Sequence, residues 1–180
     1  NLNDNDELVV GGSADVGAVT LNNAKADLSV GGNLDATSLT LTMGAADVTG
    51  NLTTTSASNI SVATDTDLTV GGTLDSRGTI TVDDGKTLKV GALGTQTNNV
   101  TTVTVTDGTL TVNGAAYASS AVTVGDSTSS PTTEGTMTVG SLTADSTVDV
   151  KNGSLEVKGA LTASGNDLIR RLLKKANQST

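Results

Sequence analysis

Apolar residues recur along the chain in short triplets of the form apolar-x-apolar, in which the middle residue is usually polar. Side chains alternate between two faces in such a triplet, so each one predicts a short strand with one buried face. The first residues of one set of triplets are separated by 20, 18, 22, 20, 22, 27 and 18 residues, which average 21. These first residues are Leu8, Leu28, Ala46, Leu68, Leu88, Leu110, Met137 and Leu155. A regular period of this length indicates a repeat architecture.

Two more apolar elements follow each of these triplets. A single apolar position comes five or six residues later and is filled in turn by Ala14, Leu34, Leu52, Leu74, Leu93, Ala116, Leu142 and Leu161. A second triplet comes 11 to 15 residues later, with apolar pairs Val19/Leu21, Leu39/Leu41, Ile60/Val62, Ile80/Val82, Val103/Val105, Val122/Val124 and Val148/Val150. Each repeat therefore predicts three short strands separated by corners rich in Gly, Asn and Asp, which together make a roughly triangular coil.

A single coil of this kind cannot fold alone. It buries about five aliphatic side chains, each worth ~1.5–3 kcal/mol, whereas ordering each of its residues costs roughly 1.5 kcal/mol. Coils become stable by stacking on their neighbours, and crossovers between parallel strands are nearly always right-handed. We therefore predict an all-β fold, a right-handed parallel β-helix (β-solenoid) of about eight coils over residues 1–165.

Residues 126–136 interrupt the repeat. They form a polar stretch that contains the only proline, Pro131, and they account for the longest interval. We expect a loop that leaves the solenoid at the seventh junction. It is either a tolerated solvent loop or a binding loop.

Residues 166–180 also depart from the repeat and predict a short amphipathic α-helix. Its apolar residues recur with helical spacing, and they are Leu168, Ile169, Leu172 and Leu173. We expect this helix to cap the last coil, as terminal elements of repeat proteins do; a membrane-surface anchor is the alternative. The N-terminal end has no corresponding plug, which predicts that it pairs with further coils or with another molecule.

The composition narrows the chemistry. The chain has no Cys, His, Trp or Phe, which excludes thiol nucleophiles, imidazole bases and the usual zinc ligands. Its net charge of −9 argues against a nucleic-acid partner, and no apolar run is long enough to span a membrane. A sugar-cleaving enzyme would rely on Asp and Glu, but the chain lacks the aromatic residues that stack on sugars. We expect a protein that is not an enzyme and that needs no cofactor.

Two acidic segments could bind a structural calcium ion. They are Asp83-Asp84 and Asp65-Thr66-Asp67. Neither matches an EF-hand loop or a calcium-binding nonapeptide repeat. Since Asp is also a common turn residue at corners, the alternative is a purely structural role.

In nearly every repeat, the middle residue of the second triplet carries a hydroxyl group. These residues are Thr20, Thr40, Ser61, Thr81, Thr104 and Thr123. Stacking should place them ~4.8 Å apart in one outward column. One interpretation is the high β-propensity of Thr and packing between Thr side chains. The other is a surface that binds ice, a glycan or a cation.

Three segments resemble a known class of repeats: Asp-Leu-Ser-Val-Gly-Gly-Asn-Leu-Asp at 27–35, Asp-Leu-Thr-Val-Gly-Gly-Thr-Leu-Asp at 67–75 and Gly-Thr-Leu-Thr-Val-Asn-Gly at 108–114. They are similar to repeats in the β-helical shafts of filamentous-haemagglutinin-type exoproteins and autotransporter passengers. The resemblance implies a secreted or cell-surface bacterial protein that serves adhesion or filament assembly. Its partners would be further copies, the rest of a longer surface protein, or a host or cell-surface glycan or protein. Bactofilins, which are cytoskeletal β-helix polymers, are the nearest alternative.

Overall fold

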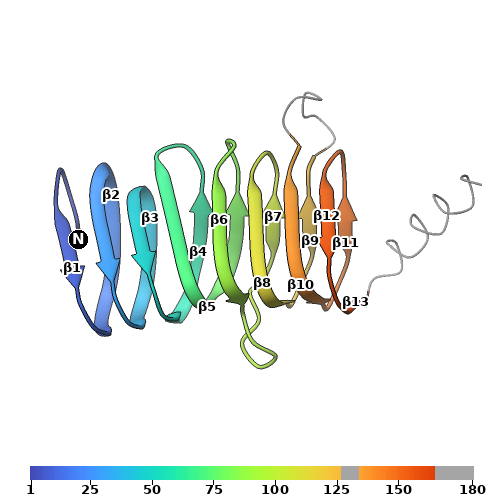
Figure 1. Cartoon of the computed structure of the whole chain (residues 1–180), viewed down its shortest axis with the longest axis horizontal. Helices are drawn as coiled ribbons and strands as arrows, with labels where there is room; N and C mark the ends of the chain where they lie inside the picture. The colour runs from blue at the N-terminus through green and yellow to red at the C-terminus, as the bar shows by residue number, and fades with distance from the viewer. Residues whose placement is uncertain (127–133, 165–180) are drawn as a thin grey trace, which may run out of the picture.

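The computed structural model of the chain describes residues 1–126 and 134–164. Over these residues it is a parallel β-solenoid of about eight turns, built from one 13-stranded sheet (Figure 1). The strands are β1 (Glu7–Val10), β2 (Ala14–Val30), β3 (Leu34–Val48), β4 (Leu52–Val62), β5 (Thr66–Val82), β6 (Thr87–Leu93), β7 (Val103–Val105), β8 (Thr109–Ala118), β9 (Val122–Val124), β10 (Thr136–Ala144), β11 (Val148–Val150), β12 (Ser154–Val157) and β13 (Leu161–Ala163).

Each coil has a first, a second and a third face, which correspond to the three elements of the sequence repeat. In Figure 1 the strands nearer the viewer run downward and those behind run upward while the chain advances from left to right, which is a right-handed winding. Several strands are longer than the sequence predicts, because pairing continues through the corners with shifts of register. The 17-residue strand β2, for example, crosses the second and third faces of the first coil and the first face of the next.

The strand registers confirm the predicted repeat. On the first face, Leu8 pairs with Leu28, Leu28 with Ala46 and Ala46 with Leu68. The pairing continues from Leu88 to Leu110, Met137 and Leu155. On the second face, the predicted apolar residues pair without a break from Ala14 to Leu161. A slip of one residue would turn the buried side chains outward, so the alternation of the triplets fixes this register.

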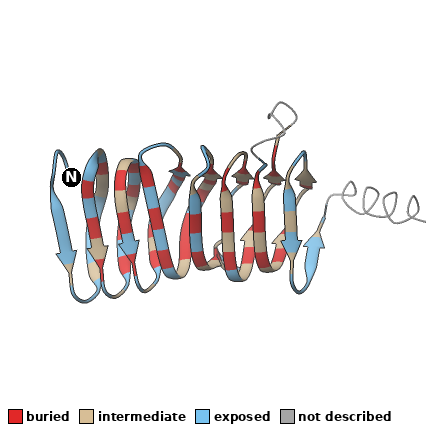
Figure 2. Ribbon diagram, turned by 45° about the horizontal axis from the view of Figure 1, so that its top comes forward, coloured by how far each residue is buried: buried red, intermediate tan, exposed pale blue. Residues whose placement is uncertain are grey.

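The core is a narrow apolar column inside the coils, made of Leu, Val, Ile, Ala and Met (Figure 2). In the central coils the inward residues are almost fully buried; Leu74 and Leu88 are both 0% exposed. In the end coils they are not, since Leu8 is 45% and Leu161 38% exposed. These side chains have a coil on one side only within the described residues, so position in the stack decides their burial.

Glycine is required at the corner between the first and second faces, because successive coils approach closely there. A Cβ on Gly140 would lie 2.6 Å from the backbone oxygen of Gly114, and one on Gly159 would lie 2.8 Å from that of Gly140. Contacts this short force a shift of the backbone, so only glycine fits without strain. The Gly-x-Leu element of the repeat therefore records coil stacking rather than an unusual backbone angle.

A ladder of side chains links this same corner across the first four coils. The backbone N–H of Asn33 donates to Oγ of Ser13 at 3.0 Å, and that of Asn51 donates to Oδ1 of Asn33 at 3.0 Å. The N–H of Thr73 then donates to Oδ1 of Asn51 at 2.8 Å. Each side chain satisfies a backbone donor of the following coil, which stabilises the stacking of neighbours.

Some expectations concern parts of the chain outside the described residues. The predicted capping helix at 166–180, with Leu168, Ile169, Leu172 and Leu173, is one of these. Most of the predicted loop at 126–136 is another, although strand pairing resumes in register directly after it, with Thr136 opposite Thr109. Among the residues that the structure does describe, no helix is long and apolar enough to cross a membrane.

Candidate functional site

The predicted column of hydroxyls lies on the third face of the solenoid. Thr20 pairs with Thr40 in one run. Ser61 pairs with Thr81, Thr81 with Thr104, and Thr104 with Thr123 in a second run. Asp149 continues the second run opposite Thr123. The side chains alternate with buried apolar neighbours such as Ile80 and Val82, so they point outward as the sequence predicts.

The column is less exposed than an isolated surface residue would be. Thr40 and Ser61 are exposed, but Thr20, Thr81, Thr104 and Thr123 are only partly so. Side chains in adjacent coils stand about 4.8 Å apart and cover one another. Much of the Thr surface is therefore used for packing between coils, which supports the structural interpretation of the column.

A break divides the column between its second and third members. Strands β3 and β4 pair only through Leu34–Ala36 and Leu52–Thr54, so no strand pairing joins Thr40 to Ser61. Instead, the N–H of Leu39 donates to Oγ of buried Ser58 at 3.2 Å. An ordered ligand such as ice would require hydroxyl groups at regular spacing. In this column the regular spacing extends only over the four members from Ser61 to Thr123.

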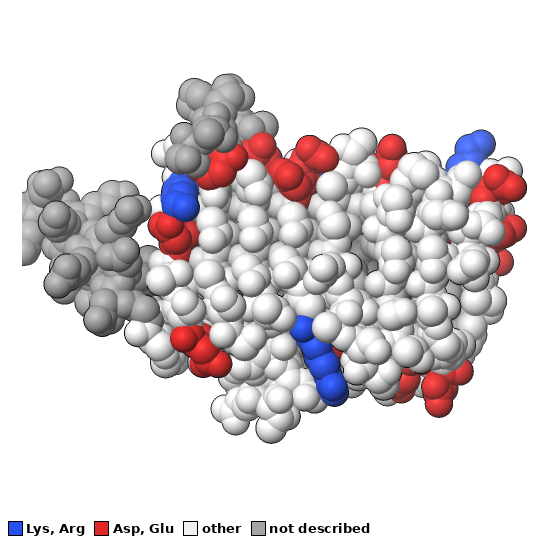
Figure 3. Space-filling view, turned by 180° about the vertical axis from the view of Figure 1, so that it is seen from behind, with Lys and Arg blue, Asp and Glu red and all other residues white. Residues whose placement is uncertain are grey.

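The third face carries little charge. It lies behind in Figure 1 and is turned to the viewer in Figure 3, where acidic residues gather along its upper edge and most of the face is neither acidic nor basic. The upper edge is the corner between the third and first faces. The described residues therefore present a third face that is largely uncharged apart from Asp149, with an acidic border.

The candidate calcium segments lie at this acidic corner, where they form turns. Asp65 and Asp84 have positive φ angles of 62° and 51°, a conformation that Asp tolerates better than most residues. Oδ2 of Asp84 accepts hydrogen bonds from the N–H of Thr64 at 3.1 Å and from its hydroxyl at 2.7 Å. These two bonds lower the pKa of the Asp84 carboxyl, and Asp84 thereby links neighbouring coils.

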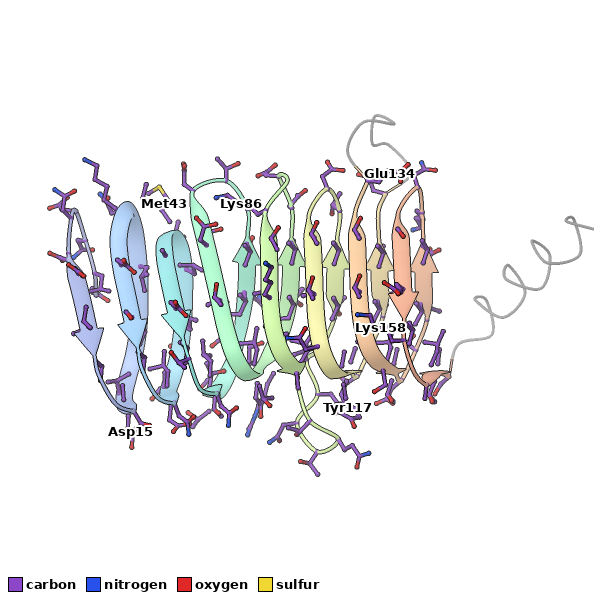
Figure 4. The ribbon with its side chains drawn as sticks, viewed as in Figure 1. Asp15, Met43, Lys86, Tyr117, Glu134 and Lys158 are labelled. Carbon is purple, nitrogen blue, oxygen red and sulfur yellow. The ribbon has the colours of Figure 1, made fainter. Side chains whose placement is uncertain are left out.

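Asp67 and Asp83 also have protein partners. Nζ of Lys86 lies 3.2 Å from Oδ1 of Asp67, and the N–H of Asp84 donates to Oδ1 of Asp83 at 2.9 Å. Figure 4 shows Lys86 at this corner. Throughout residues 1–126 and 134–164, no group of three or more His, Cys, Asp or Glu side chains could hold a metal ion. Asp67, Asp83 and Asp84 thus make the contacts of residues at a corner between coils.

A buried polar cluster, which the sequence reasoning missed, lies under the segment 94–102. Asp75 points outward from the second face but is only 6% exposed, and the side chain of Asn98 hydrogen-bonds to it. The hydroxyl of Thr101 donates to the backbone oxygen of Arg77 at 2.9 Å, and Nδ2 of Asn99 donates to Oδ2 of Asp145 at 3.3 Å. These contacts hold the segment against the solenoid.

Burial raises the pKa of the Asp75 carboxyl, while the Arg77 guanidinium and the Asn98 side chain act in the opposite direction. Nε of Arg77 lies 3.8 Å from Oδ1 of Asp75, which is too long for a hydrogen bond. Oδ1 of Asp75, Oγ of Ser76 and Oδ1 of Asn99 are buried without a hydrogen-bond partner among the described residues. Such groups destabilise the fold, so this is the least well satisfied part of the described solenoid.

Two features of the sequence could have located this cluster. The polar run Thr95-Gln-Thr-Asn-Asn99 lengthens the repeat between the first and second triplets of one coil. Arg77 is the only Arg before residue 170. The sequence could not predict that this polar run lies close to Arg77, because tertiary contacts decide on which side of the solenoid an inserted segment folds.

Comparisons with protein-family models, with curated proteins and with solved structures found no match. The geometry of the chain is thus the basis for assigning a function.

Proposed function

We propose that the chain is a structural rod, a segment of a secreted bacterial surface adhesin or of a self-assembling extracellular filament. The observation that carries this proposal is the unbroken stacking of the first and second faces from Leu8 to Leu155 and from Ala14 to Leu161. Nearly all of the apolar residues serve this stacking, and the polar clusters serve corners and loops. The resemblance to exoprotein and autotransporter shafts supports the secreted, cell-surface location.

The mechanical properties of the fold suit this function. Strands lie across the rod, so the hydrogen bonds between coils run along its axis. Tension or compression along the axis is then shared by three strands per coil and by the apolar column. The corner ladder from Ser13 to Thr73 adds side-chain bonds in the same direction.

Electron microscopy of the purified full chain tests this proposal. We expect stiff, elongated particles whose width is that of one coil and whose length is about 40 Å or a multiple of it, since about eight coils rise ~4.8 Å each. Compact, roughly spherical particles would contradict the rod. A turnover assay against polysaccharides should remain negative, because we expect no enzymatic activity.

A second candidate function is binding of ice, a glycan or a cation by the Thr column. The regular run Ser61, Thr81, Thr104 and Thr123 on a nearly uncharged face favours it. Ice-recrystallisation and glycan-array measurements test this candidate directly. Activity that is lost in Thr81→Lys and Thr104→Lys but kept in Thr69→Lys, on the first face, would favour the binding module over the rod.

A further inference from the structure

The N-terminal end of the solenoid is open and apolar. A hollow there is lined mainly by the side chains of Leu8, Val10, Ala14, Val16 and Leu28. Val9 is 64% and Val16 41% exposed. Strand β1 stands at the end of the strand order and pairs only with β2. Such an edge offers both backbone hydrogen-bonding groups and apolar surface to an incoming strand.

The glycines of the first coil fit a neighbour that the described chain does not provide. A Cβ on Gly31 would lie 2.6 Å from the backbone oxygen of Gly11 in the coil before it. Gly11 and Gly12 occupy the same corner of the first coil, yet a Cβ on either would meet nothing within 4 Å. Glycine at an unconstrained position only increases the entropy lost on folding. Gly11 and Gly12 would, however, allow another coil to approach this end as closely as coils approach one another inside the solenoid.

Leu2 pairs with Leu21 and thus adds a third-face residue next to the first coil at the N-terminal end. At the other end, the described part of the last coil supplies a first-face strand, β12, and a second-face strand, β13.

The sequences of the two end coils also match in length. Residues 154–163 and residues 7–16 align without insertion, so that Leu155 lies opposite Leu8, Gly159 opposite Gly12 and Leu161 opposite Ala14. This is the register that the ladders inside the chain use, for example Leu8 with Leu28 and Ala14 with Leu34. An added copy would continue both apolar columns.

Charge distinguishes the two ends. Residues 1–20 contain four acidic residues and no Lys or Arg, whereas the described residues 151–164 contain two Lys and one Glu. Figure 4 shows Asp15 on the first coil and Lys158 at the opposite end of the solenoid. Two N-terminal ends would repel each other, while an N-terminal and a C-terminal end would attract.

We infer that the N-terminal end docks the last coil, Ser154–Ala163, of a second copy, so that the chains assemble head to tail. The inference rests on the proposed rod function and names the partner of its N-terminal end. Because a head-to-tail contact leaves one free end of each kind, the assembly grows into filaments instead of closing as a dimer. Like-charged N-terminal ends make the closed dimer unfavourable.

Sedimentation velocity over a range of concentrations, with electron microscopy of the same samples, tests this inference on the full chain. We expect filaments whose length increases in steps of about 40 Å per copy. Gly12→Val should abolish growth, because the added side chain enters the space of the docking coil while leaving the isolated chain unstrained. Leu8→Asp should weaken association at least about ten-fold, since docking would bury its carboxylate. Circular dichroism should show that both variants remain folded.

A charge swap tests the register itself. In the proposed contact Val9 lies opposite Glu156 of the neighbouring copy. Val9→Glu should weaken association about two- to five-fold and Val9→Lys should strengthen it. In a Glu156→Lys background this order should reverse. Thr69→Glu, at the same outward position of a central coil, should leave association unchanged.

Three results would overturn the inference. The first is a full chain that stays monomeric at every concentration, as it would if a cap remained on the last coil. The second is a dimer that does not grow, and the third is assembly that Gly12→Val leaves intact. If the monomers are still stiff rods, only the docking is wrong; if no rods are seen, the proposed function fails as well.

Discussion

The first coil and a central coil have the same sequence pattern but different surroundings. Leu8 and Leu68 occupy the same position of the repeat, yet Leu8 is 45% and Leu68 2% exposed. Gly12 and Gly32 share a corner, but only Gly32 has a neighbouring coil where its Cβ would lie. The comparison teaches that a coil of this solenoid does not bury its own residues. Its neighbours bury them.

The largest expected effect comes from placing a charge in the core at the two locations. Leu74→Asp should destabilise the protein by about 4 kcal/mol or more and unfold neighbouring coils, because its carboxylate has no hydrogen-bond partner and no water there. Leu8→Asp should cost much less, since nearly half of that side chain is already exposed. Chemical denaturation followed by circular dichroism measures both. Equal losses would show that burial does not depend on position in the stack.

The corner glycines provide the next comparison. Gly140→Ala should cost about 1–3 kcal/mol, because its Cβ would lie 2.6 Å from the backbone of Gly114. Gly12→Ala meets nothing in the isolated chain and should be neutral or stabilising by up to about 1 kcal/mol. Denaturant midpoints below the concentration of assembly give both values. A loss of stability in Gly12→Ala as large as that in Gly140→Ala would contradict the role assigned to coil contact.

The buried carboxylate under the segment 94–102 predicts a pH dependence. The pKa of Asp75 is higher in the folded chain than its ordinary value of 3.8, so the folded state binds more protons between those two pKa values. Its contribution to stability is therefore greatest below this window and is lost as the pH rises through it. In Asp75→Asn this part of the pH profile of the unfolding free energy should disappear. An unchanged profile would show that Asp75 is not desolvated.

At neutral pH the same substitution should change the unfolding free energy by less than about 1 kcal/mol, because the exposed Arg77 stabilises the charged form only weakly. Asp35→Asn is the matched control on the second face, where the side chain is exposed. It should stay within about 0.5 kcal/mol of the parent chain.

The smallest effect is expected in the Thr column. Thr81→Ser removes one methyl group from a partly exposed side chain and should cost well under about 1 kcal/mol. Val82→Ala, one residue further along β5, removes two methyl groups from a side chain that is 0% exposed and should cost distinctly more. If both variants melted at the same temperature, the inward and outward assignment of this strand would be wrong.

The sequence predicted the stacking because the pattern of period 2 leaves little choice. Each anchor residue from Leu8 to Leu155 must point inward, and a slip of one residue would expose the whole triplet. The partial exposure of Thr81 was not foreseen, since side chains of adjacent coils shield each other and this shielding does not appear in a single repeat. The sequence placed the column on one face but gave no sign of the break between Thr40 and Ser61.

Features that depend on tertiary contacts escaped prediction. The polar cluster around Asp75 forms because the segment 94–102 folds onto the second face, and nothing in the repeat specifies this. The corner ladder from Ser13 to Thr73 depends on side chains that the sequence shows only as turn residues. The acidic segments at Asp65 and Asp84 left a turn and a calcium site open as alternatives, and the hydrogen bonds of Asp84 to Thr64 in the adjacent coil became visible only in three dimensions.

Amide hydrogen exchange resolved by residue tests most directly whether neighbouring coils stabilise one another. We predict the strongest protection in the central strands β5, β6 and β8 and progressively weaker protection towards β1 and β13, because each end coil has fewer neighbours. The measurement should be made below the concentration at which chains associate. Uniform protection along the chain, or protection that is strongest in β1, would contradict this account.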